Sequence, residues 1–212
     1  MRPLTTTTTD VVRMAQRGFA TMPTITGPWL DDQQRLCNFT DNTFQPVASS
    51  SSNNNDDDDT AYVVRNPATQ EVLGTVPETS EAEFEDILRK AQDAYNEWSR
   101  VPVQQRQRIM MRYQHLIREH TDALVQTIVA ENGKTAADAA GDVFRGLEVV
   151  ETASAAVATH MQGQSLRGLS SDVDCVSYRR PLGVVAGLCP FNFPAVRNFL
   201  VFMGVRARIP LL

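Results

Sequence analysis

The stretch PLGVVAGLCPFNFP, residues 181–194, decides the fold that this sequence predicts. Its first half is a short apolar run between two glycines, which is typical of a strand buried on both faces, and we expect that strand over residues 183–188. Its second half is a turn, because a proline stands on each side of Phe191-Asn192-Phe193. A buried parallel strand that ends in a rigid loop is where open α/β sheets bind ligands.

Asn192 is the polar side chain of that turn. A primary amide donates hydrogen bonds without carrying charge or titrating. In a dry site, Asn192 could therefore stabilise an oxygen that becomes negative during a reaction. The alternative is a buried turn in which the asparagine caps its own backbone.

Three separated motifs carry a resemblance to a known family. They are CPFNFP at residues 189–194, GDVFRGLEVVE at 141–151 and RNPATQEVLG at 65–74. Together they resemble the aldehyde dehydrogenase superfamily, and the Pro-Phe-Asn-Phe-Pro form of the turn is similar to its methylmalonate-semialdehyde dehydrogenase branch. The resemblance extends from about Tyr62 to Ala195.

The resemblance implies an α/β fold: residues 23–195 would form the amino-terminal part of a Rossmann-like NAD-binding domain. A strand of the family's oligomerisation sheet is expected near residues 172–180, so the protein would be a homo-oligomer. Apolar residues at helical spacing predict helices near 81–97, 103–131 and 135–160.

Local signals add detail to these helices. Ser80 and Glu83 form a capping box before the first helix, and Asn132-Gly133 closes the second. We expect the arginines of the second helix mostly on its solvent side: Arg106, Arg108, Arg112 and Arg118. The apolar stripe of the first helix is expected in the core: Phe84, Ile87, Leu88, Ala91, Tyr95 and Trp98. The same is expected of Val143, Phe144, Leu147, Val150 and Ala153 in the third.

Two short β regions precede the helices. A hairpin is predicted over residues 62–77 with its turn at Asn66-Pro67. Further upstream we expect an edge strand or hairpin whose apolar residues pack on the body: Leu36, Phe39 and Phe44. Residues 49–60 between them are low in complexity, and a disordered surface insert is favoured over an acidic metal site, which would need spaced ligands.

The resemblance also implies a reaction. A cysteine thiolate would attack methylmalonate or malonate semialdehyde, with Asn192 and a backbone N–H holding the oxyanion. NAD would accept a hydride, and coenzyme A would release the acyl group as carbon dioxide is lost. Residues Cys189, Pro190, Phe191 and Asn192 would line the nicotinamide side of the NAD site. Cys189 is not the nucleophile by this resemblance.

Arg145 is the candidate substrate-binding residue. In this branch the matching arginine lies near the carboxylate of the substrate, which a guanidinium can hold through two parallel hydrogen bonds. The alternative is an ion pair with Glu148, three residues further along the same helix.

The last residues differ from the family pattern. Residues 196–212 carry three arginines and no acidic residue, and the Gly-Gln-Arg-Cys setting of the family's nucleophile does not occur in the sequence. We therefore expect this chain to be inactive although its family is enzymatic. The alternative function is that of a non-catalytic remnant or the product of an incorrectly defined gene, able at most to associate with sister subunits. A membrane anchor is disfavoured, because these arginines do not segregate onto one face.

Composition sets the remaining expectations. Residues 1–22 are rich in arginine and threonine and contain one acid, Asp10, which is typical of a mitochondrial transit peptide and predicts a matrix location; a frayed basic tail is the alternative. A net charge of −5 gives no nucleic-acid signature, and no apolar run is long enough to cross a bilayer. The three cysteines have no metal-binding spacing, so no metal is expected.

Overall fold

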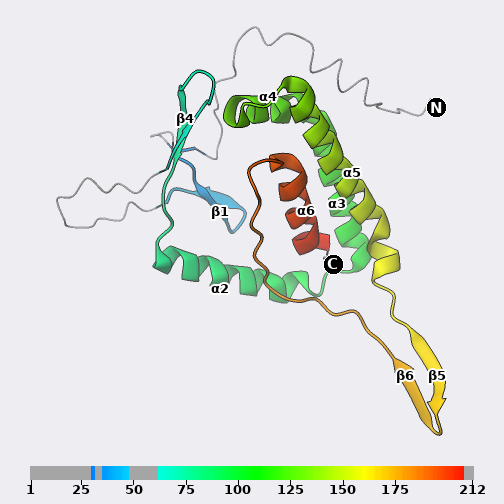
Figure 1. Cartoon of the computed structure of the whole chain (residues 1–212). Coiled ribbons are helices and arrows are strands. Elements are labelled where there is room, and N and C mark those ends of the chain that lie inside the picture. The colour runs from blue at the N-terminus through cyan, green and yellow to red at the C-terminus, as the bar shows by residue number, and fades with distance from the viewer. Residues whose placement is uncertain (1–29, 32–34, 48–61, 208–212) are drawn as a thin grey trace. The chain divides into compact units, whose positions relative to one another are not determined.

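The structure is a computed structural model that describes residues 30–31, 35–47 and 62–207 of the 212-residue chain (Figure 1). The predictions for residues 1–22 and 49–60 lie outside these residues. The chain divides into two compact units, one of residues 1–94 and 122–141, the other of residues 95–121 and 142–212.

The first unit contains two antiparallel hairpins (Figure 1). In one of them β1 (Asn38–Thr40) pairs with β2 (Thr43–Gln45), and in the other β3 (Tyr62–Arg65) pairs with β4 (Val72–Val76). The second was predicted as a hairpin, and the first is the hairpin of the two predicted alternatives, an edge strand or a hairpin. The expected packing of the first hairpin on the body is wrong for its phenylalanines, because Phe39 and Phe44 are exposed. Their rings pack on each other instead, with centroids 4.8 Å apart.

The predicted Asn66-Pro67 turn joins β3 to β4. Asn66 is buried, and its Oδ1 accepts hydrogen bonds from the backbone N–H groups of Ala68 at 2.9 Å and Thr69 at 3.2 Å. An asparagine that replaces backbone partners in this way is a common turn device. It fixes the direction in which β4 returns.

Helix α2 (Glu81–Trp98) begins at the predicted capping box. The Glu83 N–H donates to Ser80 Oγ at 3.3 Å, and the Ser80 N–H donates to Glu83 Oε2 at 3.0 Å. The expected burial of its apolar stripe is wrong, since no residue of α2 is buried and both Phe84 and Leu88 are exposed. An amphipathic stripe is buried only where another element covers it, and the described residues leave this one largely uncovered.

The predicted helix over 103–131 is two helices, α3 (Val103–Glu119) and α4 (Thr121–Asn132). Thr121 Oγ1 donates to the carbonyl oxygens of Ile117 at 2.9 Å and Arg118 at 3.1 Å. Those carbonyls belong to the last turn of α3, whose acceptors have no partner inside the helix. The prediction of a continuous helix is therefore wrong at His120.

Gly133 ends α4 as predicted. Its N–H donates to the Val129 carbonyl at 3.1 Å, and its φ of 74° lies in the left-handed region. A Cβ at this position would lie 2.6 Å from Pro67 Cγ in the β3–β4 turn. A glycine is required here both by the backbone conformation and by the space.

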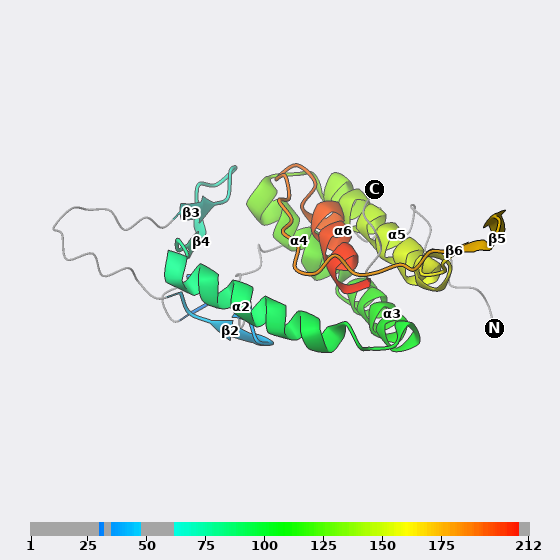
Figure 2. The same cartoon turned by 90° about the horizontal axis from the view of Figure 1, so that it is seen from below.

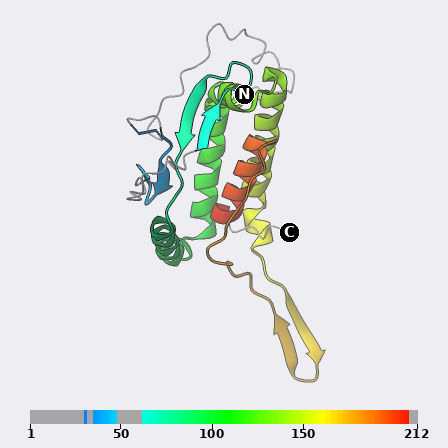
Figure 3. The same ribbon diagram turned by 60° about the vertical axis from the view of Figure 1, so that its left-hand side comes forward.

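The second unit is built on α3, on α5 (Ala136–His160) from residue 142 onward, and on α6 (Pro194–Ala207), which lie side by side (Figures 2 and 3). Glu151 on α5 accepts hydrogen bonds from two α3 side chains, Gln114 at 2.9 Å and Arg118. The core of this unit is apolar, as predicted for α5, and it contains Met110, Ile117, Val143, Leu147, Val150 and Ala153.

Arg106 corrects the expectation for the arginines of α3. Its side chain is buried, and Nε donates to the Val101 carbonyl at 3.1 Å in the loop before the helix. Arg108, Arg112 and Arg118 are exposed as expected. The Arg106 side chain is thus directed at the backbone of the loop before α3 and not at solvent.

A hairpin of β5 (Ser165–Ser170) and β6 (Val173–Val176) extends away from the helices of the second unit (Figure 3). β6 falls within the strand predicted near 172–180, whereas its partner β5 was not predicted. Every residue of both strands is exposed. Among the described residues this sheet has no third strand.

The predicted buried strand over 183–188 is wrong. These residues have no strand pairing and include a bend at Val184, and Val184 and Val185 are 41% and 43% exposed. A strand needs a neighbour for its backbone N–H and C=O groups, and no described residue supplies one to this segment. The turn that follows is present, and Pro194 begins α6, a position that suits proline.

Candidate active site around the Asn192 turn

The turn at 191–193 places Asn192 between the unpaired segment at 183–190 and the start of α6. The amide is exposed, and so are its neighbours, with Phe191 at 84%. The described residues therefore supply the turn but not the dry surroundings in which an oxyanion donor is most effective. The role of Asn192 stays a prediction.

Cys189, Pro190 and Phe191 are consecutive and exposed. Burial, followed by the nearby Asp31 carboxylate, raises the pKa of Cys37, and Arg35 opposes the shift. A catalytic thiol needs the opposite shift, toward the thiolate. Cys37 is therefore a poor nucleophile.

Arg145 lies on α5 and is exposed. In the part of the chain that the structure describes, Arg145 forms no ion pair with Glu148. The alternative explanation for this arginine, an intrahelical pair, thus has no support in the geometry. Its guanidinium is accessible to a carboxylate from outside.

Asp142, three residues before Arg145, joins α5 to the turn and was missed by the sequence analysis. Its Oδ2 accepts a hydrogen bond from the Ala195 N–H at 3.3 Å, and its Oδ1 accepts one from the Val196 N–H at 3.2 Å. The residue is only 3% exposed. One signal was available, namely an acidic residue directly beside Val143 on the predicted apolar side of the helix.

Two glycines mark close approaches to α6. A Cβ on Gly146 would lie 2.4 Å from Phe199 Cδ2, and a Cβ on Gly187 would lie 2.4 Å from Val201 Cγ1. The ring of Phe199 also meets Tyr113 of α3 edge to face, with centroids 6.0 Å apart. Burial raises the pKa of Tyr113 to about 12.

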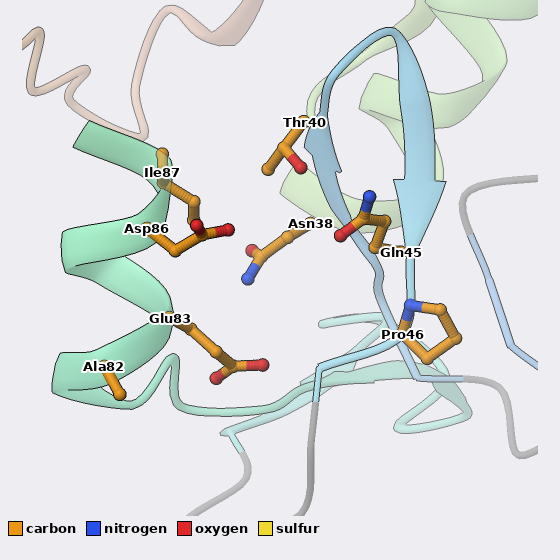
Figure 4. Close-up of a pocket in the computed structure, with 8 residues that line it drawn as sticks. All are labelled: Asn38, Thr40, Gln45, Pro46, Ala82, Glu83, Asp86 and Ile87. Carbon is orange, nitrogen blue, oxygen red and sulfur yellow. The ribbon is translucent and has the colours of Figure 1, made fainter. Parts of the chain in front are cut away.

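A separate pocket lies in the first unit between the β1–β2 hairpin and α2 (Figure 4). Its volume is about 250 Å³, and it contains none of the predicted site residues. Its two carboxylates already have partners: Glu83 accepts the capping-box bonds, and Asp86 pairs with Arg89 at 2.5 Å and Lys90 at 2.8 Å. Lys90, and then Arg89, lower the pKa of Asp86. The pocket lining is Asn38, Thr40, Gln45, Pro46, Ala82, Glu83, Asp86 and Ile87.

Neither a metal centre nor a membrane span is found where the structure describes the chain. No three histidine, cysteine or acidic side chains in the described ranges are grouped closely enough to hold an ion. Within the same ranges, no helix combines the length and the apolar character that crossing a bilayer requires.

Residues 54–202 match the aldehyde dehydrogenase family, and the chain belongs to that family. The match confirms the resemblance on which the α/β expectation rests, and it extends to residue 202 in α6.

Two relatives carry more specific names. The chain is 48% identical over 139 residues to the mitochondrial methylmalonate-semialdehyde dehydrogenase [acylating] of Arabidopsis thaliana, covering 66% of this chain and 23% of the relative. It is 50% identical over 132 residues to malonate-semialdehyde dehydrogenase 3 of Geobacillus kaustophilus, covering 62% and 27%. The chain thus spans about a quarter of the length of these relatives.

Solved structures agree with this assignment. The chain resembles a protein of Sinorhizobium meliloti, described as a methylmalonate-semialdehyde dehydrogenase and solved with NAD, at 30% identity and a TM-score of 0.66. The likeness covers 76% of this chain and 32% of the other. The predicted fold class, a partial aldehyde dehydrogenase fold, is confirmed.

Proposed function

We propose that this chain contributes to an NAD-dependent, coenzyme-A-acylating methylmalonate-semialdehyde dehydrogenase. The observation that carries the proposal is the CPFNFP turn directly before α6, in a chain 48% identical to an enzyme of that name. The reaction would oxidise methylmalonate or malonate semialdehyde, transfer the acyl group to coenzyme A and release carbon dioxide.

Within that reaction the side-chain N–H of Asn192 would donate a hydrogen bond to the oxyanion that forms when a thiolate adds to the aldehyde. The exposed backbone of residues 189–192 would hold the nicotinamide ring of NAD. This segment fits the cofactor because its residues are exposed and leave room for a flat ring. NAD supplies the hydride acceptor when bound.

Arg145 would bind the carboxylate that distinguishes semialdehydes of this class from simple aldehydes. Support comes from its exposure and from the missing pair with Glu148 within the described chain. A guanidinium offers two parallel donors to one carboxylate, which lysine does not.

The proposed cellular setting is the mitochondrial matrix. The Arabidopsis relative is named as mitochondrial, whereas the Geobacillus relative is bacterial. Residues 1–22, with their low acid content, would direct the chain to the matrix. The β5–β6 hairpin, with both outer edges open in the described chain, would join sister subunits.

The test uses a chimera in which residues 62–202 replace the corresponding segment of the Geobacillus enzyme. In that protein, Asn192→Ala should lower kcat on the order of 100- to 1000-fold and leave NAD binding nearly unchanged. Asn198→Ala is the matched control, because Asn198 is an exposed asparagine on the adjoining helix. Unchanged turnover in Asn192→Ala would remove the site assignment.

A second pair of variants tests Arg145. Arg145→Lys should raise KM for carboxylate-bearing aldehydes and spare propanal, because a single ammonium cannot reproduce the paired hydrogen bonds. Arg112→Lys, an exposed arginine on α3, should change neither value. An equal rise in KM for both kinds of aldehyde would contradict the assignment.

The 212 residues by themselves are a second case. None of Cys37, Cys175 and Cys189 stands in the family's Gly-Gln-Arg-Cys setting, which favours a chain without turnover of its own. Purified and supplied with NAD, coenzyme A and methylmalonate semialdehyde, it should form no NADH. Robust NADH formation would overturn this part of the proposal.

A further inference from the structure

We infer that Asp142 is a positioning residue for the turn that carries Asn192, an inference that rests on the proposed role of that turn. Asp142 belongs to the GDVFRGLEVVE motif, of which the proposed chemistry uses only Arg145. The hydrogen-bond partners of Asp142 are backbone N–H groups of the same unit, 53 and 54 residues further along the chain.

The start of α6 is the point of attachment. The first N–H groups of a helix have no partner within the helix and must be satisfied from outside. Here the two oxygens of Asp142 accept one N–H each, from Ala195 at 3.3 Å and from Val196 at 3.2 Å. The N-terminal cap of α6 is therefore supplied by a different helix, α5.

Because Asp142 is buried, its carboxylate depends on the two N–H groups of α6. Asp142 is 3% exposed, and a buried carboxylate is costly unless hydrogen bonds satisfy its oxygens. The two N–H groups do so, and the positive end of the α6 dipole adds to the attraction. An asparagine would keep the shape but would bring an NH₂ group, a second donor, against one of the two N–H donors.

Gly146 gives independent support. It lies one helical turn after Asp142, and a Cβ there would be 2.4 Å from Phe199 Cδ2 and 3.4 Å from the Ala195 carbonyl carbon. Two residues one turn apart on α5 thus contact α6. Asp142 accepts hydrogen bonds from the first turn of α6, and Gly146 leaves space for the Phe199 side chain. Both contacts fall within the first turns of α6.

The connection from this anchor to Asn192 is short. Asn192 precedes Pro194, the first residue of α6, by two positions, and the proline ring fixes its own φ. An anchor on residues 195 and 196 therefore limits where the asparagine amide can point. If the cap is lost, the turn gains freedom before the rest of the unit does.

The first experiment uses the 212-residue chain and measures amide hydrogen exchange by mass spectrometry. In Asp142→Asn, peptides covering residues 190–199 should exchange about tenfold faster, the scale of a lost helix cap, while peptides of α3 stay unchanged. Asp142→Glu should restore part of the protection. Asp138→Asn is the matched control, an exposed carboxylate on α5 that accepts the Thr135 hydroxyl at 2.8 Å.

Unchanged exchange at residues 190–199 would overturn the inference. A uniform rise across α3, α5 and α6 would also overturn it, because that result would mean general destabilisation. The exchange measurement requires no enzymatic activity, so it tests the role of Asp142 even if the proposed function is wrong.

The second experiment uses the chimera. Asp142→Asn should lower kcat about tenfold with KM for NAD unchanged, and it should have no further effect in the Asn192→Ala background, because residues that act through one another are not additive. Full additivity would overturn the inference. A chimera that forms no NADH would instead contradict the proposed function. The exchange measurement would still decide the role of Asp142.

Discussion

Helix α5 and the segment at 181–193 both carry family motifs, but only α5 is covered by other parts of the described chain. Val143 and Val150 of α5 are buried, whereas Val184 and Val185 are nearly half exposed. A helix makes its backbone hydrogen bonds internally and needs only a packing surface. A strand directs its backbone groups at a neighbour. A clear motif therefore does not ensure that a segment is structurally self-sufficient.

The largest expected effect lies in the packed region. Met110→Ala should lower the free energy of unfolding by about 2–5 kcal/mol, because Met110 is fully buried between the helices of the second unit. Urea unfolding followed by circular dichroism measures the change. Met111→Ala, at an exposed neighbouring position, should change stability by less than about 0.5 kcal/mol. Equal effects of the two variants would mean that the helices do not pack as described.

A smaller effect is expected at the α5–α6 contact. Gly146→Ala should destabilise by about 1–3 kcal/mol through overpacking against Phe199, less the gain of about 1 kcal/mol in helix propensity. Gly141→Ala should show the gain alone, because nothing lies within 4 Å of its added Cβ. Urea midpoints of the two variants on opposite sides of the parent would support the close approach; a stabilised Gly146→Ala would contradict it.

Helix α2 tests whether a capping box can stabilise a helix whose apolar face is not buried. Ser80→Ala should cost about 1 kcal/mol, because the Glu83 N–H loses its cap. Glu85→Ala, at an exposed position of the same helix, serves as the control. Helix content from circular dichroism as a function of temperature reports the difference. No loss in Ser80→Ala would show that α2 depends on contacts other than its capping box.

The smallest effect is expected where the strand prediction failed. Val185→Thr should change the stability of this chain by less than about 0.5 kcal/mol, since the side chain is exposed. Val150→Thr, the same substitution at a buried position, should cost about 1–3 kcal/mol for the hydroxyl it buries. Urea unfolding of both variants gives the comparison. A large cost at Val185 would show that the segment is covered in solution.

Local sequence signals predicted most of the fold. The Ser80 cap, the Asn66 turn and the Gly133 helix end are each made by residues close together in the chain, and all three occur. The prediction failed where a distant partner decides the outcome. The strand at 183–188 lacks a neighbour within the described chain, and the apolar stripe of α2 is largely uncovered there.

The candidate site was predicted in part. The Asn192 turn and the exposed Arg145 are where the sequence placed them. Asp142 was missed although its place beside Val143 was a signal, because its partners, the N–H groups of residues 195 and 196, are backbone atoms that the sequence does not identify. Arg106 was misplaced for a similar reason, since its hydrogen bond is to the carbonyl of Val101.

The β5–β6 hairpin has a practical consequence for solubility. Leu166, Leu169, Val173 and Val176 are all exposed on it, and each strand has one edge without a partner in the described sheet. Exposed edges with apolar side chains recruit further strands from other molecules. These two short strands would then lower the concentration at which this chain stays soluble.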